Sequence, residues 1–93
     1  MYSCSHTIDD IENEESFDVT FFGSVTVDNQ NVIHEVFGKP TVAEFMVPIC
    51  DKAEWNEAIY TNRQNSLIEH YLFANLEWIK NGIEDNYFDQ RLL

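Results

Sequence analysis

Three histidines and two cysteines are the side chains of this 93-residue chain best suited to metal binding or nucleophilic catalysis. Such sites need close and regular spacing, for example two histidines four residues apart on one helix face. His6, His34 and His70 are far apart in the chain, and neither Cys4 nor Cys50 belongs to a nucleophile motif. We therefore expect no metal, no cofactor and no catalytic residue, and we interpret the histidines as surface or boundary residues.

Carboxylates are far more numerous, with 17 acidic residues against 5 basic residues and a net charge of −12. General acid–base catalysis needs two carboxyl groups in different environments, one of them desolvated. The acidic residues here are clustered among other polar residues, which predicts that their carboxylates are solvated. We therefore expect no enzyme activity.

The negative charge is concentrated at the start of the chain, where the first 38 residues contain eight acids and no lysine or arginine. This charge should repel nucleic acid and anionic membranes and attract a basic protein surface. The alternative is an acidic face that only keeps the protein soluble. The candidate partner-binding residues are these eight acids and one tryptophan: Asp9, Asp10, Glu12, Glu14, Glu15, Asp18, Asp28, Glu35 and Trp78.

The first half of the chain is predicted to form strands. Residues 1–16 are predicted to be a flexible acidic arm, because their acidic run repels itself. From Phe17, apolar and polar residues alternate, which predicts strands over about 17–27, 32–37 and 42–49. Gly23 suggests a bulge or bend, and 28–31 and 38–40 are predicted turns. Such short connections favour an antiparallel meander of three or four strands.

The second half of the chain is predicted to form helices. Asp51 could cap a short helix over about 52–60, and Thr61 with Gln64 resembles a capping box. One apolar stripe then follows helical spacing, with Gly82 as a plausible terminator: Ile68, Leu72, Leu76, Ile79 and Ile83. Residues 17–93 are thus predicted to be a single α+β domain, with a C-terminal helix pair packed on one face of the sheet.

Trp78 lies at the margin of the helical stripe. It is either a core residue or an anchor for a partner, since tryptophan is enriched at binding hot spots. Free thiols in a cytoplasmic protein are expected, because no secretory signal and no membrane-length apolar run are seen. A Cys4–Cys50 bridge is the alternative.

Several segments give a more specific resemblance. They are Phe-Gly-Ser-Val-Thr-Val-Asp at 22–28, Val-Phe-Gly-Lys-Pro at 36–40, Thr-Asn-Arg-Gln at 61–64, and the later Tyr71, Phe73, Ile79, Tyr87 and Phe88. In size, charge and order of elements, residues 20–88 resemble immunity proteins of polymorphic and contact-dependent growth inhibition toxin systems. The resemblance implies binding to a cognate toxin, frequently a basic nuclease.

Three functional hypotheses follow. The first is a cytoplasmic immunity or inhibitor protein that covers the active site or substrate groove of a basic toxin. The second is a phage-encoded DNA mimic of the anti-CRISPR or anti-restriction type, which the small size and the charge suit equally well. The third is a scaffold or regulatory subunit of a larger complex.

Overall fold

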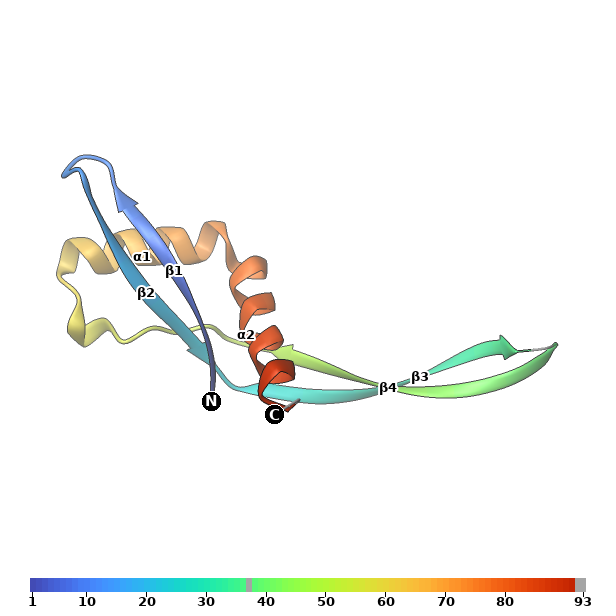
Figure 1. Ribbon diagram of the computed structural model, residues 1–93. Coiled ribbons are helices and arrows are strands. Elements are labelled where there is room, and N and C mark those ends of the chain that lie inside the picture. The colour runs from blue at the N-terminus through green and yellow to red at the C-terminus, as the bar shows by residue number, and fades with distance from the viewer. Residues whose placement is uncertain (37, 92–93) are drawn as a thin grey trace.

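The computed structural model describes residues 1–36 and 38–91, and it shows four antiparallel strands followed by helices (Figure 1). The elements are β1 (Tyr2–Asp10), β2 (Glu15–Gly23), β3 (Val25–Val36), β4 (Lys39–Cys50), a 3₁₀ turn η1 (Glu57–Ile59), α1 (Asn62–Ala74) and α2 (Leu76–Arg91). The α+β class and the helix pair packed on strands are confirmed. Phe37, which the sequence places at a strand end, lies outside the described residues.

The four strands form two separate hairpins, β1–β2 and β3–β4, and not one continuous meander. The predicted flexible arm is wrong for most of its length, because Tyr2–Asp10 form β1 and pair with β2 along its whole length. Along β1, half-buried or buried residues alternate with exposed Ser3, Ser5, Thr7 and Asp9. This period of two outweighs the repulsion among the acids, most of which fall in or beside the turn.

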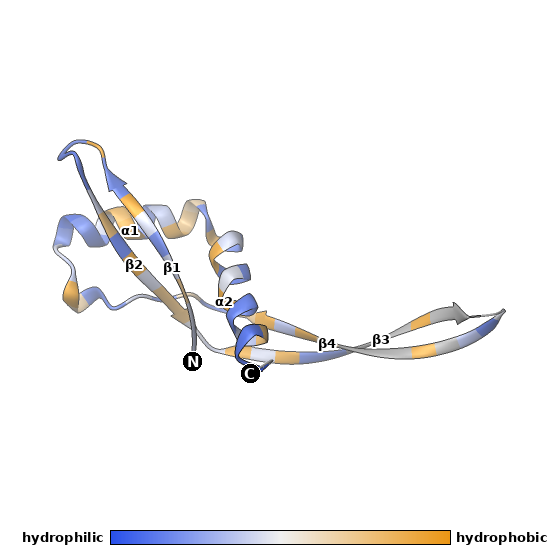
Figure 2. Ribbon diagram, in the orientation of Figure 1, coloured by the Kyte–Doolittle hydropathy of each residue, from blue (hydrophilic) through white to orange (hydrophobic). Residues whose placement is uncertain are grey.

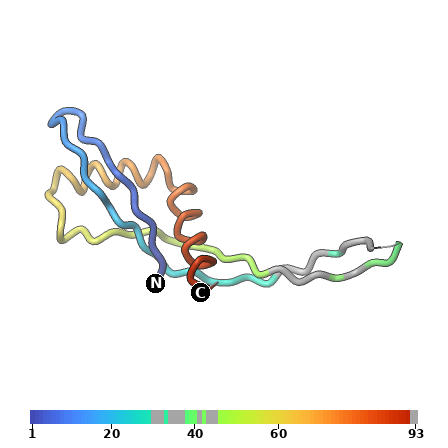
Figure 3. Tube along the Cα trace, viewed as in Figure 1, coloured from blue at the N-terminus to red at the C-terminus, as the bar shows by residue number. Residues whose placement is uncertain are grey.

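The core lies between the inner face of β1–β2 and the two helices. Its fully buried side chains come from both: Val19, Phe21, Ile68, Ile79 and Ile83 are all 0% exposed. Figure 2 colours both apolar and hydrophilic residues along β1, β2 and the two helices. The start of β1 and the end of α2 lie side by side (Figure 3), where the rings of Tyr2 and Tyr87 are 5.1 Å apart.

The long helical segment begins at Thr61 as predicted, and it divides into α1 and α2 where no break was predicted. The Thr61 side chain accepts from the Gln64 amide at 3.1 Å and Gln64 Oε1 accepts from the Thr61 amide at 2.9 Å, which completes the capping box. Asn75 ends α1, and its carbonyl accepts from the Ile79 amide at the start of α2. Gly82 does not terminate a helix but lies inside α2, where an added Cβ would meet Cys4 Sγ at 3.2 Å.

The segment between β4 and α1 is extended, where the sequence predicted a short helix. Phe22 and Glu54 exchange two backbone hydrogen bonds of 2.8 Å, so this segment runs beside β2. Only Glu57–Ile59 form a helical turn, with Asn56 as its cap. The long-range pairing with β2 therefore outweighs the capping signature at Asp51.

The β3–β4 hairpin, termed the long hairpin below, projects from the rest of the molecule, termed the body (Figure 1). The molecule measures 63 × 22 × 21 Å, and its radius of gyration is 18.2 Å, against about 12 Å for a compact chain of this length. The predicted turn at 28–31 is wrong, since these residues lie within β3. The hairpin instead turns beside Gly38, whose φ of 76° is the left-handed conformation that glycine favours.

Candidate functional site

The end of the β1–β2 hairpin gathers most of the candidate acids. Residues 11–14 form the turn, in which the Glu14 amide donates to the Ile11 carbonyl at 3.4 Å. Glu14 adopts a φ of 53°, and Ile11 is 86% exposed at the turn. We call the exposed carboxylates of this region the acidic tip: Asp9, Glu12, Glu14, Glu15 and Asp18.

Asp10 differs from its neighbours, because it is buried and bound within the fold. Arg63, in the first turn of α1, donates from Nε to Oδ2 and from Nη2 to Oδ1, both at 2.7 Å. Asn13 adds a backbone and a side-chain donor to the same carboxylate. These hydrogen bonds lower the pKa of Asp10 to about 2, and the largest contribution comes from Arg63. Asp10 therefore joins the tip to α1 and is not a surface carboxylate.

The remaining tip acids face solvent. Glu12 shares Arg63 through a 3.1 Å contact, and Asp18 accepts from Thr7 Oγ1 at 2.7 Å. Among the described residues, Asp9, Glu14 and Glu15 form no ion pair. Two open depressions of about 480 and 320 Å³ lie here, and both are lined by Asp9, Asp10 and Ile11. The tip thus presents unmatched negative charge around one exposed apolar side chain.

The other candidates lie elsewhere. Asp28 is an exposed residue of the long hairpin, and Glu35 lies in the same strand, with its side chain outside the described residues. Trp78 lies in the first turn of α2, where its ring packs against His6 of β1, three residues before Asp9 in the chain. The structure therefore gathers the acids of 9–18 on one hairpin, and Asp28, Glu35 and Trp78 lie on other elements.

Trp78 is 62% exposed, which decides against a core position. Its ring meets His6 edge-on, with the ring centroids 4.7 Å apart, and Nδ1 of His6 is 2.8 Å from the Tyr71 hydroxyl. Partial burial lowers the pKa of His6 and so favours the neutral ring. Phe73, at the end of α1, is 86% exposed. Two large aromatic side chains are therefore open to solvent near the corner between the helices.

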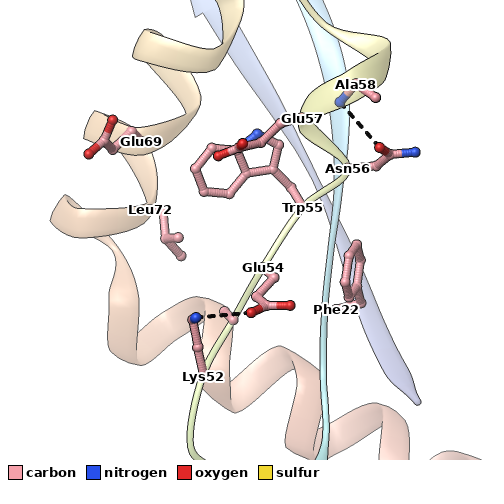
Figure 4. A pocket seen from close by; sticks show the side chains of 10 residues that line it. Phe22, Lys52, Glu54, Trp55, Asn56, Glu57, Ala58, Glu69 and Leu72 are labelled. Carbon is pink, nitrogen blue, oxygen red and sulfur yellow. Dashed lines mark hydrogen bonds and ion pairs between the residues drawn. The ribbon is translucent and has the colours of Figure 1, made fainter.

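A second candidate site is an open groove of about 890 Å³ between the 52–58 segment and α1 (Figure 4). Trp55 lies at its centre, and the indole Nε1 donates to Asn65 Oδ1 at 2.9 Å. Three carboxylates line it, those of Glu54, Glu57 and Glu69. The single lining cation, Lys52, is 3.0 Å from Glu54 and paired with it. An aromatic ring beside surplus carboxylates suits a lysine or arginine side chain.

Comparison with known proteins finds no match: no family model, no curated protein and no solved structure is similar to this chain. Its function must therefore be argued from its surfaces.

Three further features concern metal binding, membrane crossing and the two thiols. Among residues 1–36 and 38–91, no group of three or more His, Cys, Asp or Glu side chains could hold a metal ion. Within the described part of the chain, no helix is long and apolar enough to cross a membrane. Burial raises the pKa of both Cys4 and Cys50, which disfavours the reactive thiolate form.

The groove around Trp55 does not follow from the predicted elements. A helix over 52–60 would bury Trp55, whereas the extended segment leaves it half-buried beside a cavity. The signal that could have revealed it is the alternation of Ala53 and Trp55 with polar Lys52, Glu54 and Asn56, which is typical of extended chain.

Proposed function

We propose that this protein is a cytoplasmic immunity or inhibitor protein that binds and neutralises a basic toxin, most simply a nuclease domain. The observation that carries the proposal is the acidic tip, where exposed carboxylates surround Ile11 with one shared arginine among them. Carboxylates fixed on a hairpin can match the cations with which a nuclease holds phosphates. No catalysis by the chain itself is part of the proposal.

In this proposal, charge would raise the association rate and apolar groups would lengthen the lifetime of the complex. The net charge of −12 accelerates encounter with a basic partner. Ile11 and Trp78, both largely exposed, would be desolvated at the interface, and the Trp55 groove would take a cationic side chain of the toxin. Desolvated aromatic anchors dominate many interfaces, so these groups would slow dissociation.

The distribution of charge bears on the alternative of a DNA mimic. A DNA duplex carries its charge evenly along its axis. Here the long hairpin, residues 25–50, has three acids and one base, whereas the rest of the chain has 14 acids and four bases. The net charge is therefore −10 on the rest of the chain and only −2 on the long hairpin. This favours a compact acidic interface over mimicry along the whole length.

The test is co-expression with the product of the neighbouring gene, followed by co-purification and a nuclease assay of that product. We expect a complex at low salt that weakens as salt rises, and loss of nuclease activity within it. Replacing Asp9, Glu14 and Glu15 by lysine should abolish both. The matched control replaces three acids outside the two proposed sites, Asp51, Asp85 and Asp89, and should leave a measurable complex. Binding to several unrelated DNA-binding proteins would instead support the DNA mimic.

A further inference from the structure

One face of the long hairpin continues the core outward and carries Met46, Val42 and Ile33 together with polar Asn29. By register, Val25 pairs with Cys50, Asn29 with Met46, and Ile33 with Val42. Cys50 is 3% exposed at the root, whereas Met46 is 48%, Val42 64% and Ile33 71% exposed farther out. A two-stranded ribbon alone is marginally stable in water, so a projecting hairpin of this length would gain stability from a partner.

The two edges of this hairpin differ. The Cys50 amide donates to Glu84 Oε2 at 2.9 Å and not to β3. Because backbone groups of successive strand residues point alternately toward and away from the paired strand, the even-numbered residues of β4 direct their backbone groups away from β3. Pro40 and Pro48 belong to that set, and proline has no amide hydrogen to donate. The outer edge of β4 thus lacks two donors. On β3 the outward set runs from Val25 to Glu35 at odd positions and contains no proline.

We propose that β3 is a dimerisation edge that pairs antiparallel with β3 of a second copy of this chain. The two ribbons would form one sheet in the order β4–β3–β3–β4. Full overlap places the twofold axis at residue 30 and sets Ile33 of one copy opposite Val27 of the other. Because each β4 edge lacks donors at its prolines, growth stops at two copies and no filament forms.

Charge supports a second copy as the occupant of this edge. The long hairpin has a net charge of only −2, from three acids and one base. It is therefore poorly matched to a basic toxin, and the electrostatic repulsion between two copies of it is small. Paired along a strand of about 40 Å, the two acidic bodies lie at opposite ends of the sheet. That separation exceeds the Debye length of about 8 Å, so their repulsion is largely screened.

The experiment measures mass in solution by sedimentation, up to about 100 μM protein, a range that covers weak specific association. We expect a dimer whose dissociation constant changes by less than about threefold between low and high salt, unlike toxin binding. Asn29→Pro removes an outward donor from β3 and should give a monomer. Met46→Pro is the matched control, because Met46 faces Asn29 in the register and proline there alters only the β4 edge.

A second pair of variants tests the same edge without proline, which could itself cause misfolding. Ile33→Lys should weaken the dimer at least about tenfold, since Ile33 lies beside the partner strand, and Val42→Lys on the outer strand should weaken it less. Circular dichroism would verify that each variant is folded. A wild-type chain that stays monomeric, or equal effects of Asn29→Pro and Met46→Pro, would overturn the proposal. Loss of toxin binding with the dimer intact would bear only on the proposed function.

Discussion

Arg63 and Asp10 form a bidentate ion pair, with Nε to Oδ2 and Nη2 to Oδ1 both at 2.7 Å, that fastens the β1–β2 hairpin to the first turn of α1. Asp10 is 5% exposed and so belongs to the fold, although it sits in the middle of the acid-rich run. The same arginine reaches Glu12 at 3.1 Å. The tip carboxylates therefore stand on a braced hairpin and not on a loose arm.

Asp10→Asn should lower the thermal unfolding midpoint by several degrees at neutral pH, because Arg63 loses its bidentate partner. The pKa of Asp10 falls from 3.8 to about 2 on folding, so the ion pair stabilises the fold above about pH 4 and ceases to do so as pH falls through 2. The difference between wild type and Asp10→Asn should shrink over that range. Asp9→Asn, at the exposed neighbouring position, should change the midpoint little; equal effects would contradict the assignment.

Local signals in the sequence predict where the long helical segment begins and which residues it buries. They do not predict where that segment breaks or which surfaces the fold forms. The Thr61 capping box and the Ile68, Ile79 and Ile83 stripe depend on near neighbours, and both are present. The break at Asn75 interrupts a stripe whose spacing continues across it. The groove arises because Glu54 pairs with Phe22, a contact between residues 32 apart that no local pattern shows.

The wrong strand predictions have a different cause. The acids at 9–15 resemble a charge run, which hides the alternation from Tyr2 to Ile8 that builds β1. Asp28 and Asn29 resemble turn residues, yet they are exposed positions of a projecting ribbon, where polar side chains cost little. The sequence therefore predicts the acidic composition of the surface. It does not predict that these acids lie at the end of a hairpin held by the ion pair between Asp10 and Arg63.

Gly23→Ala should destabilise the fold by about 1–3 kcal/mol, the usual cost of overpacking. A Cβ at this position would collide with the Lys52 backbone carbonyl and touch Cys50 Sγ at 3.0 Å. Gly82→Ala is the control: its Cβ would meet only the Cys4 side chain, at 3.1 Å, and alanine gains about 1 kcal/mol of helix propensity. Urea unfolding should rank the two variants in that order, and the reverse order would contradict the close approach at Gly23.

His6 should make the protein less stable in mild acid. Burial lowers the pKa of His6, so as pH falls below about 6.5 the unfolded chain takes up the proton first and folding is penalised. Urea midpoints of wild type and His6→Gln, measured at about pH 8 and about pH 5.5, should show a larger loss for wild type. His70→Gln, at an exposed position of α1, should retain the wild-type profile. A loss of equal size in His6→Gln would exclude this histidine as the cause.

Trp78→Ala should weaken binding of the proposed toxin by at least about tenfold, as expected for a desolvated aromatic anchor. Its effect on folding should be small, because 62% of the side chain is exposed and the ring packs mainly against the edge of His6. Phe73→Ala, 86% exposed at the end of α1, is the matched control for simple loss of apolar surface. Calorimetry with the purified partner should find the larger loss for Trp78, mostly as faster dissociation. If Trp78→Ala binds as wild type does while lysine substitutions at the acidic tip abolish binding, the interface is confined to the tip.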